Sequence, residues 1–597
     1  MRQQTLRYTV DPHDLAGHRL KVTLWITEVT GSTQIVSMPA WIPGSYLIRD
    51  FSRHIETIRG RHGGQWHQPR KLDDHRWAFE NCRGSLTIEI VVYAWDLSVR
   101  GAHVDDSHAF FNGTSVFLKV HGLESAPCVV DIKRPAGKLR WQAYTSMPPA
   151  KGRLPTDSLG CFLAPDYDAL IDHPFELGTP QVIRFEACGA RHSMVFTGQV
   201  PNLDLKRIAA DVKQVCEAQI KLFEPKTARA PFLDSAPEYV FMTMVTADGY
   251  GGLEHRASTA LLTSRHDLPT LHQTKPPEGY VTFLGLVSHE YFHTWHVKRI
   301  KPAVFVSYDL AKPNHTRLLW IFEGFTSYYD DLMLVRSGVI DLPTYFKQLA
   351  KTITGVHSGP GRHKQSLANS SFDAWTKYYK QDENAPNSIS SYYAKGSLVA
   401  LGLDLVIRKR SNHQKSLDDV MRALWQGYGR DFYRGKSRGL TETGFAQAVK
   451  EATGVDVRTE LHAWVEQTAD VPLDELLKEA LDEHGYVLEW IVKDNAPALG
   501  ATFKPQGEFL SIRQVIEGGA AHEAGLSAGD LLVACNGLRI GNSASALTQL
   551  LGAYRPGDKV TLHAFRGDVL QVRPVRLAAP PASTCEIKPK TQKATGN

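Results

Sequence analysis

The segment from Val287 to Trp295 constrains the chain more than any other, because it holds the sequence H-E-x-x-H within an apolar and aromatic run. Residues four apart lie on one face of a helix, so His289 and His293 can bind the same metal ion. Glu290 can reach a water molecule on that ion and act as a general base. Two imidazoles and a neighbouring carboxylate are typical of zinc metallopeptidases. The competing explanation is accidental spacing, because the chain contains 25 histidines.

A catalytic zinc site needs three protein ligands and one open position, so a third ligand is expected. Glu323 lies in the apolar and aromatic run from Trp320 to Tyr329. A carboxylate in such a run needs a partner if it is buried, and a metal ion would be that partner. Asp330, two turns along the same predicted helix, could accept a hydrogen bond from the second ring nitrogen of a ligand histidine. The alternatives are a helix-start residue on a solvated edge for Glu323 and an exposed helix carboxylate for Asp330.

Three further segments carry motifs of one family of zinc peptidases. They are Pro39–Tyr46, with a W-x-P-G-x-Y pattern, Gly251–His255, in the place of a G-x-M-E-N motif, and Tyr393–Gly396, with the pattern Y-x-K-G. Together with the zinc motif, they make the chain resemble the glycyl aminopeptidases, a branch of the gluzincin metallopeptidases that carries a C-terminal PDZ domain. This branch is related to aminopeptidase N and leukotriene A4 hydrolase. The resemblance covers nearly the whole chain, and it departs from the aminopeptidase N pattern at Leu253 and His255.

The resemblance implies a role for several of these residues. It implies that Tyr393 stabilises the tetrahedral intermediate and that Glu254 binds the α-ammonium group of a substrate. Gly251 and Gly252 precede Glu254 and would let an extended peptide pair with an edge strand. A small first residue, Gly or Ala, is implied for the substrate in the same way. Considered by themselves, Glu254 also fits a surface carboxylate at a strand end, and Tyr393 fits a packed aromatic residue at a helix start.

The length and the residue pattern predict a multidomain α+β protein, because 597 residues are too many for one hydrophobic core. Residues 1–170 alternate apolar and polar side chains, which predicts an N-terminal β-sheet domain. Residues 171–410 have a mixed α/β pattern, for which the resemblance implies a thermolysin-like catalytic domain, and residues 411–484 are predicted to form a helical subdomain. Residues 485–578 are assigned to a PDZ domain, and residues 579–597, rich in Pro, Lys and Thr, to a disordered tail.

Two segments outside the zinc motif have more than one interpretation. The Glu517–Gly537 segment follows the A-x-x-A-G-L-x-x-G-D pattern of bacterial PDZ domains and ends in an Asn-Gly hairpin turn. Its peptide groove would lie beside Leu499–Phe503, where backbone N–H groups could receive a carboxylate; the alternative is a PDZ fold that only packs on the catalytic part. The Trp41–Tyr46 loop is either a rigid turn with packed aromatic residues or a border of the active-site cleft.

Composition excludes several other classes of function. The net charge of +5 arises from 68 basic and 63 acidic residues without a long basic run, which argues against a nucleic-acid or membrane partner bound by charge. Seven scattered cysteines without a C-x-x-C pair predict reduced thiols. The chain has neither an apolar N-terminal segment nor a run of 18 apolar residues, so a cytoplasmic location is expected.

The sequence therefore predicts a zinc-dependent aminopeptidase with one catalytic ion and peptide substrates. A peptide or a protein C-terminus is a possible ligand of the PDZ domain. A PDZ-containing zinc endopeptidase is the alternative, because PDZ modules also accompany processing proteases. A non-catalytic PDZ scaffold is the third hypothesis, and the intact Glu290 argues against it, because a protein without catalysis would be free to lose the base.

Overall fold

The computed structural model describes residues 4–29, 31–152, 157–492 and 496–590. The chain divides into two units, each assembled from segments that are separate in the sequence. The first unit is made of Met1–Asn314, Tyr329–Ile340 and Met421–Thr441, and the second of His315–Tyr328, Asp341–Val420 and Glu442–Asn597. The bounds of the two units differ from the predicted domain boundaries. Helices α5 (Gly324–Ser337) and α10 (Leu417–Leu424) each begin in the second unit and end in the first.

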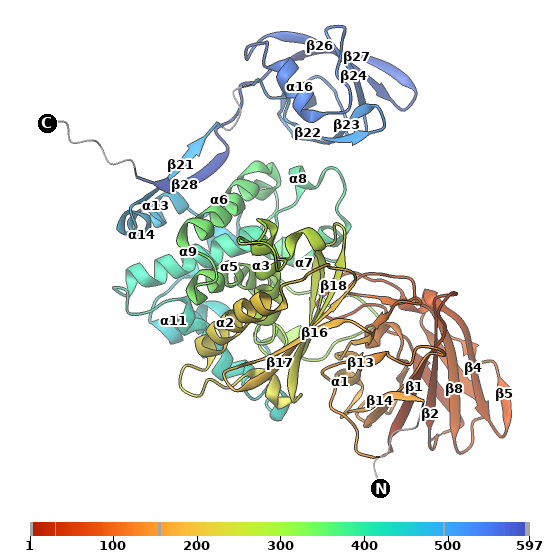
Figure 1. Ribbon diagram of the computed structural model, residues 1–597. Coiled ribbons are helices and arrows are strands. Elements are labelled where there is room, and N and C mark those ends of the chain that lie inside the picture. The colour runs from red at the N-terminus through yellow and green to blue at the C-terminus, as the bar shows by residue number, and fades with distance from the viewer. Residues whose placement is uncertain (1–3, 30, 153–156, 493–495, 591–597) are drawn as a thin grey trace. The chain divides into compact units, whose positions relative to one another are not determined.

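The N-terminal part of the first unit is built from β-sheets, as the alternating pattern predicts (Figure 1). Along β2, for example, Leu20, Val22 and Leu24 are buried while the residues between them are partly exposed. The largest sheet has the strand order β14-β12-β1-β2-β8-β4-β5. Its strands are β1 (Leu6–Asp14), β2 (Arg19–Ile26), β4 (Ile55–His62), β5 (Gln65–His67), β8 (Leu86–Tyr93), β12 (Cys128–Lys133) and β14 (Ser158–Ala164).

Two smaller sheets complete this β-rich part. One contains β9 (Ala102–Val104), β10 (Ala109–Phe111), β13 (Gln142–Tyr144) and β15 (Phe175–Gly178) in the order β13-β15-β10-β9. The other contains β3 (Thr33–Ser37), β6 (Arg70–Lys71), β7 (Arg76–Glu80) and β11 (Lys119–Val120) in the order β11-β3-β7-β6. Because β15 pairs with these strands, the N-terminal β region runs to Gly178, beyond the predicted boundary at residue 170. The short helix α1 (Tyr167–Ile171) lies just before β15.

A second β-sheet in the first unit positions the zinc motif. Its strands are β16 (Gln181–Ala187), β17 (Ala190–Thr197), β18 (Glu238–Thr246), β19 (Gly251–Glu254) and β20 (Ser258–Ser264), in the order β16-β17-β18-β20-β19. Strands β17, β18 and β20 are parallel, and β18 is buried along most of its length, as is usual for a central parallel strand. Strand β19 is antiparallel to β20 and forms an edge of the sheet.

Two helices cover this sheet. Helix α2 (Leu205–Phe223) packs against β16, and helix α3 (Gly279–Phe292) packs against β19, β20 and α2 (Figure 1). The side chain of Asp204 caps the first turn of α2 by accepting a hydrogen bond from the backbone N–H of Arg207. Helix α3 carries His289 and Glu290 in its last turn and ends directly before His293. It is apolar on most sides, so it is buried almost completely.

The second unit contains most of the helices. Outside the PDZ region, they are α4 (Leu319–Phe322), α6 (Leu342–Ser358), α7 (Leu367–Phe372), α8 (Ala385–Ser388), α9 (Ala394–Arg410), α11 (Gly444–Thr453), α12 (Arg458–Leu461), α13 (Leu473–Leu476) and α14 (Lys478–Glu483). Helices α5 and α9 lie so close together that a β-carbon on Gly324 would be only 2.6 Å from the carbonyl carbon of Gly396. The glycine of the Y-x-K-G sequence therefore serves helix packing.

The PDZ sheet has its own hydrophobic core, which includes Leu510, Leu532 and Leu562. The sheet contains β22 (Ala501–Gln506), β23 (Phe509–Val515), β24 (Leu531–Cys535), β25 (Leu538–Arg539), β26 (Lys559–Arg566) and β27 (Val569–Arg576), accompanied by α15 (Ala520–Glu523) and α16 (Ala544–Leu551). Asn536 and Gly537 have φ angles of 50° and 82°, which is the left-handed conformation expected of the predicted hairpin turn.

The prediction of a disordered tail over residues 579–597 is wrong for part of this segment. Residues Thr584–Pro589 form β28, which pairs with β21 (Tyr486–Ile491) outside the PDZ sheet. Cys585 is buried there, and α6 packs against β28. The abundance of Pro and Lys in the tail concealed this short strand, whose burial depends on residues far away in the sequence. Residues 591–597 of the predicted tail lie outside the described residues.

All seven cysteines lie within the described residues and are free, as predicted.

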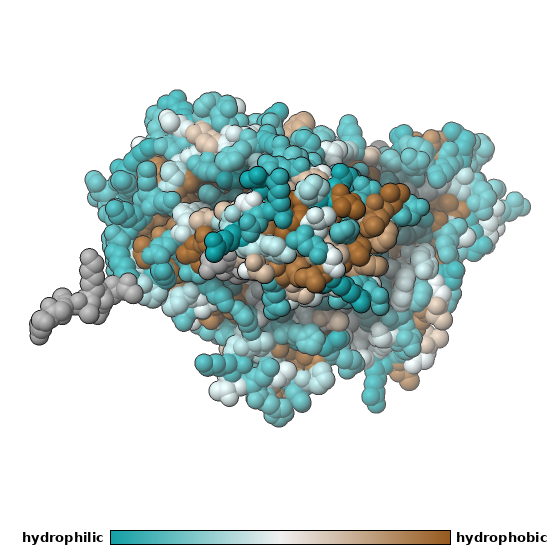
Figure 2. Space-filling model, turned by 90° about the horizontal axis from the view of Figure 1, so that it is seen from above, coloured by the Kyte–Doolittle hydropathy of each residue, from teal (hydrophilic) through white to brown (hydrophobic). Residues whose placement is uncertain are grey.

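Figure 2 shows one face of the molecule, where apolar side chains gather in patches between polar ones. Exposed apolar residues of the PDZ part include Leu538, Val569, Leu570 and Val572. Among the described residues, no helix combines the length and the hydropathy that a membrane crossing requires.

Candidate active site

The two histidines of the motif face each other at the end of α3. His289 lies in the last turn of the helix, and His293 directly follows Phe292 as its C-terminal cap. Their Nε2 atoms are 3.1 Å apart. Two nitrogen ligands at 2.0–2.1 Å from one tetrahedral zinc ion would be about 3.3 Å apart. The structure thus brings the two side chains together at the separation that a shared metal ion requires.

The other ring nitrogens fix the tautomers of both histidines. Nδ1 of His293 lies 2.7 Å from the carbonyl oxygen of His296, which can only accept, so this nitrogen carries the proton. Nδ1 of His289 lies 3.0 Å from Oδ2 of Asp330 and donates to that carboxylate. Each Nε2 atom therefore presents a lone pair, and two lone pairs at this distance repel each other unless a cation lies between them. The donor set fits a zinc ion.

Asp330 is held at the histidine pair by a short network. Its backbone carbonyl accepts a 2.8 Å hydrogen bond from the hydroxyl of Ser288, and the side-chain amide of Gln219 donates to the Ser288 carbonyl at 2.9 Å. Helices α2, α3 and α5 are tied together in this way. Burial raises the pKa of the Asp330 carboxyl, and the hydrogen bond with His289 opposes that shift. A cation on the histidine pair would favour the ionised carboxylate.

Two buried carboxylates lie beside His293. Glu290 on α3 is 5% exposed and Glu254 at the end of β19 is 4% exposed. One carboxylate oxygen of each and one ring nitrogen of His293 all lie within 4.8 Å of one another. Oε1 of Glu254 has no hydrogen-bond partner among the described residues. Because two buried carboxylates at this separation repel each other, the arrangement favours a bound cation.

The glycines of β19 allow the strand to lie against Glu290. A β-carbon on Gly252 would be 2.0 Å from Oε1 of Glu290, whereas one on Gly251 would meet only Nη1 of Arg100, at 3.8 Å. Arg100 also contacts the strand, with its Nη2 atom 3.4 Å from the carbonyl oxygen of Gly252. Sequence patterns could not point to this arginine, because it belongs to no motif and lies far from β19 along the chain.

The Trp41–Tyr46 loop of the N-terminal domain borders the same site. Gly44 has a φ angle of +97°, and a β-carbon there would lie 2.5 Å from Oε2 of Glu254. Trp41 and Tyr46 are fully buried, and the indole N–H of Trp41 donates to the carbonyl of Asp309 at 2.9 Å. The loop is therefore a rigid turn with packed aromatic residues, and its Gly44 lies against Glu254.

In the second unit, Glu323 lies between α4 and α5 and is 2% exposed. Tyr393 is the residue that precedes α9, and its hydroxyl lies 3.3 Å from that of Tyr379. Burial raises the pKa values of Tyr378 and Tyr392, and the nearby Glu323 carboxylate adds to both shifts. Glu323 is thus buried beside a cluster of tyrosines, which excludes the solvated helix start that the sequence left open.

The fold and the paired histidines with their neighbouring glutamate define a zinc metallopeptidase. Family profiles agree: the Peptidase M61 N-terminal domain matches residues 7–179, M61 glycyl aminopeptidase matches residues 282–399, and the PDZ domain matches residues 497–576. The aminopeptidase N family protein from Idiomarina loihiensis, known from a crystal structure, is 40% identical, with a TM-score of 0.91 and 98% of each chain covered. The chain belongs to the M61 glycyl aminopeptidase family and is a zinc aminopeptidase.

More distant similarities are partial. The M1 zinc metallopeptidase from Deinococcus radiodurans is 13% identical, with a TM-score of 0.48, over 79% of this chain and 96% of that chain. A probable periplasmic serine endoprotease of the DegP-like type from Pseudomonas putida is 33% identical over 108 residues. A similar protein from Hahella chejuensis is 37% identical over 89 residues. This chain spans only 22% and 18% of the length of these two relatives.

Proposed function

We propose that the protein removes small N-terminal residues, Gly or Ala, from peptides by means of one zinc ion bound to His289, His293 and Glu323. One observation carries this proposal: the two Nε2 lone pairs are 3.1 Å apart beside the buried pair of carboxylates, Glu254 and Glu290. This constellation has places for two cations, the metal ion and the ammonium group of a peptide. An aminopeptidase has to bind both the metal ion and the ammonium group, whereas an endopeptidase needs only the metal ion.

Glu323 is the best candidate for the third ligand. It is a buried carboxylate, and such a group needs a compensating positive charge. It directly precedes α5, the helix that carries Asp330 to His289, and seven residues of helix correspond to about two turns. When bound, zinc polarises the scissile carbonyl and lowers the pKa of an attacking water. The two histidines and Glu323 would leave one coordination position open for this chemistry.

Glu290 moves the proton in this scheme. Its carboxylate accepts a proton from the attacking water and then delivers it to the nitrogen of the leaving amine. Gly252 supports this role, because the absence of a β-carbon leaves room for the carboxylate beside β19. Tyr393 donates a hydrogen bond from its hydroxyl to the oxyanion that develops on the carbonyl oxygen.

Glu254 binds the α-ammonium group and fixes the register of the substrate. The peptide pairs with the free edge of β19 next to Gly251 and Gly252, so that its first residue lies at Glu254. Gly44 lies against the carboxylate on one side, and one carboxylate oxygen has no hydrogen-bond partner among the described residues. An ammonium group would satisfy that oxygen with a charge-assisted hydrogen bond.

Two substitutions separate the ligand from the base. Glu323→Ala should remove most of the zinc from the purified protein, as measured by elemental analysis, because a two-histidine site binds the ion weakly. Glu290→Gln should keep the zinc and lose nearly all turnover of a glycyl amide. Full zinc occupancy in the first variant would reject Glu323 as a ligand, and substantial turnover in the second would reject Glu290 as the base.

A substrate panel tests the specificity. Glycyl, alanyl, leucyl and phenylalanyl amides should be cleaved with kcat/KM values that fall as the first side chain grows. An N-acetylated glycyl peptide should be a poor substrate, because it lacks the ammonium group that Glu254 binds. Efficient cleavage of the acetylated peptide would instead favour the PDZ-containing endopeptidase.

A further inference from the structure

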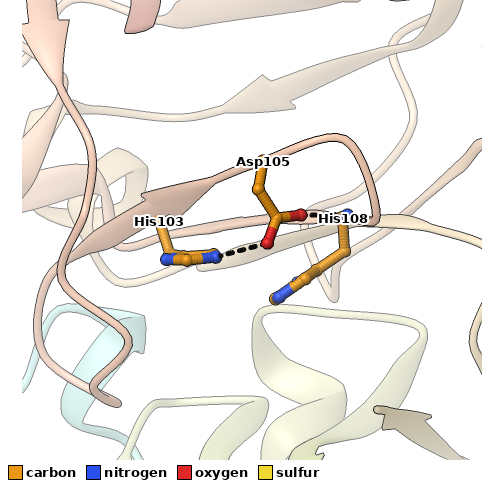
Figure 3. A group of neighbouring side chains, drawn as sticks. All are labelled: His103, Asp105 and His108. Atoms are coloured by element: carbon orange, nitrogen blue, oxygen red, sulfur yellow. Dashed lines mark hydrogen bonds and ion pairs between the residues drawn. The ribbon is translucent and has the colours of Figure 1, made fainter. Parts of the chain in front are cut away.

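We propose that His103, Asp105 and His108 form a second metal site, in the N-terminal β region, which binds a divalent first-row transition metal such as Zn²⁺. The three residues lie on the hairpin of β9 and β10, and Figure 3 shows the two rings on either side of the Asp105 carboxylate. One ligand atom from each lies within 4.8 Å of the others. This site shares no residue with the catalytic centre.

The hairpin presents Asp105 as a fixed ligand. Its Oδ1 atom accepts hydrogen bonds from the backbone N–H of Ser107 at 2.7 Å, from the Ser107 hydroxyl at 2.6 Å and from the N–H of His108 at 3.0 Å. The second oxygen, Oδ2, lies 3.2 Å from Nε2 of His103. One oxygen thus stabilises the turn, and the other is directed to the histidines. Two ligands of one metal ion are found about this far apart.

His108 is oriented by a buried carboxylate from another strand. Its Nδ1 atom lies 3.0 Å from Oε1 of Glu176 on β15, a residue that is 2% exposed. Because a carboxylate accepts, Nδ1 carries the proton, and in the neutral ring Nε2 keeps a lone pair that can bind a metal ion. Metal-binding histidines in proteins are held by this same contact between the second ring nitrogen and a carboxylate.

The charges of the cluster favour a cation. Within the described residues, the ion pairs of Asp105 and Glu176 are made with His103 and His108 rather than with Lys or Arg. With both imidazoles neutral, the group carries two negative charges, which a divalent ion would neutralise. His103 is 3% exposed, and its Nδ1 atom has no hydrogen-bond partner among the described residues. Its Nε2 atom, which lies beside Asp105, is the nitrogen that would bind the ion.

An ion can reach the cluster from a neighbouring cavity. His108 and Ser107 line a cavity of about 420 Å³, together with residues of β17 and β18 such as Thr197 and Met244. The ring of Trp95 stacks on His103, with the ring centroids 4.7 Å apart, and covers the cluster on that face. Two imidazoles and one carboxylate match the preferences of Zn²⁺, Co²⁺ or Ni²⁺, while Ca²⁺ and Mg²⁺ prefer oxygen ligands alone.

Metal stoichiometry of the full chain tests the proposal. The protein is stripped with a chelator, reconstituted with Zn²⁺, freed of excess metal and analysed for zinc. We expect two zinc ions per chain in the parent, one in His108→Ala, one in His293→Ala and none in the double variant. His67→Ala is the matched control and should leave two ions bound. The His67 ring stacks on that of His62 near the surface, with the ring centroids 4.2 Å apart. Turnover of a glycyl amide should be unchanged in His108→Ala.

Two conservative variants guard against a failure to fold. Asp105→Asn keeps an oxygen for the turn hydrogen bonds and should still lose the second ion. Glu176→Gln should weaken binding of that ion by roughly 10- to 100-fold. With Co²⁺ in the His293→Ala protein, the visible absorption of a nitrogen-bound cobalt ion should appear and should vanish in Asp105→Asn.

The second metal site would be refuted by the following zinc contents. A parent protein with one zinc ion that is lost in His293→Ala but retained in His108→Ala and Asp105→Asn would refute the second site. The cluster would then be a hydrogen-bonded turn. Failure of the catalytic proposal looks different, because it would leave the zinc content of His293→Ala equal to that of the parent.

Discussion

Replacing Gly252 with alanine should disable the proposed general base while leaving the backbone intact. The new β-carbon would lie 2.0 Å from Oε1 of Glu290, and the three atoms nearest to it all belong to that side chain. Gly252 does not have a positive φ angle, so alanine can adopt its conformation. Because β19 is held by its pairing with β20, the Glu290 carboxylate has to move.

The required movement sets the magnitude of the effect. Ordinary contact between heavy atoms begins near 3.5 Å, so the carboxylate must shift by about 1.5 Å. A displacement of about 1 Å in a catalytic group can cost about 100-fold in rate. We therefore expect kcat/KM on a glycyl amide to fall about 100-fold, which corresponds to about 2.7 kcal/mol of transition-state stabilisation. Zinc content should stay the same.

The neighbouring glycine provides the control. A β-carbon on Gly251 would meet only Nη1 of Arg100, at 3.8 Å, which is an ordinary contact. Gly251→Ala should therefore keep nearly parental kcat/KM on the same amide. Combined with Glu290→Gln, Gly252→Ala should cause no further loss, because both changes act on one group. Parental activity in Gly252→Ala, or an equal loss in both alanine variants, would refute the reasoning.

Two other residues give predictions of different kinds. Glu254→Ala should lower kcat/KM on free-amine substrates roughly 10- to 100-fold, since a charge-assisted contact contributes about 1.5–3 kcal/mol, and should affect an acetylated peptide much less. An equal loss on both substrates would mean that Glu254 supports the fold instead of binding the amine. Asp330→Asn should weaken zinc binding by roughly 10- to 100-fold in a chelator competition, because the negative partner of His289 Nδ1 is removed. An unchanged affinity would contradict this role.

Local spacing was sufficient to predict that the two histidines of the zinc motif lie together. His289, Glu290 and His293 lie within two turns of one helix, so the geometry of a helix alone determines which of their side chains meet. The Asn536-Gly537 turn was predictable for the same reason, since its conformation depends on those two residues and their immediate neighbours.

Contacts between distant segments could not be derived in this way. The sequence could not show that Gly44 lies against Glu254, that Arg100 contacts Gly252, or that Thr584–Pro589 pairs with β21. The wrong assignment of the disordered tail has this origin, because composition describes a segment without its partner strand. Likewise, the H-x-D-x-x-H spacing of the β9–β10 hairpin is visible in the chain, but its buried carboxylate, Glu176, is not.

Residue types and local periodicity can be taken directly from the chain, and they are sufficient for the zinc motif, the PDZ pattern and the α+β class. The folded chain is needed to see which carboxylates are buried together, which strand forms the edge beside Glu290, and which imidazole nitrogens carry protons. This difference arises because the conformation of a hydrogen-bonded turn depends on residues that are neighbours in the chain. Burial and charge interactions depend on groups brought together from anywhere along it.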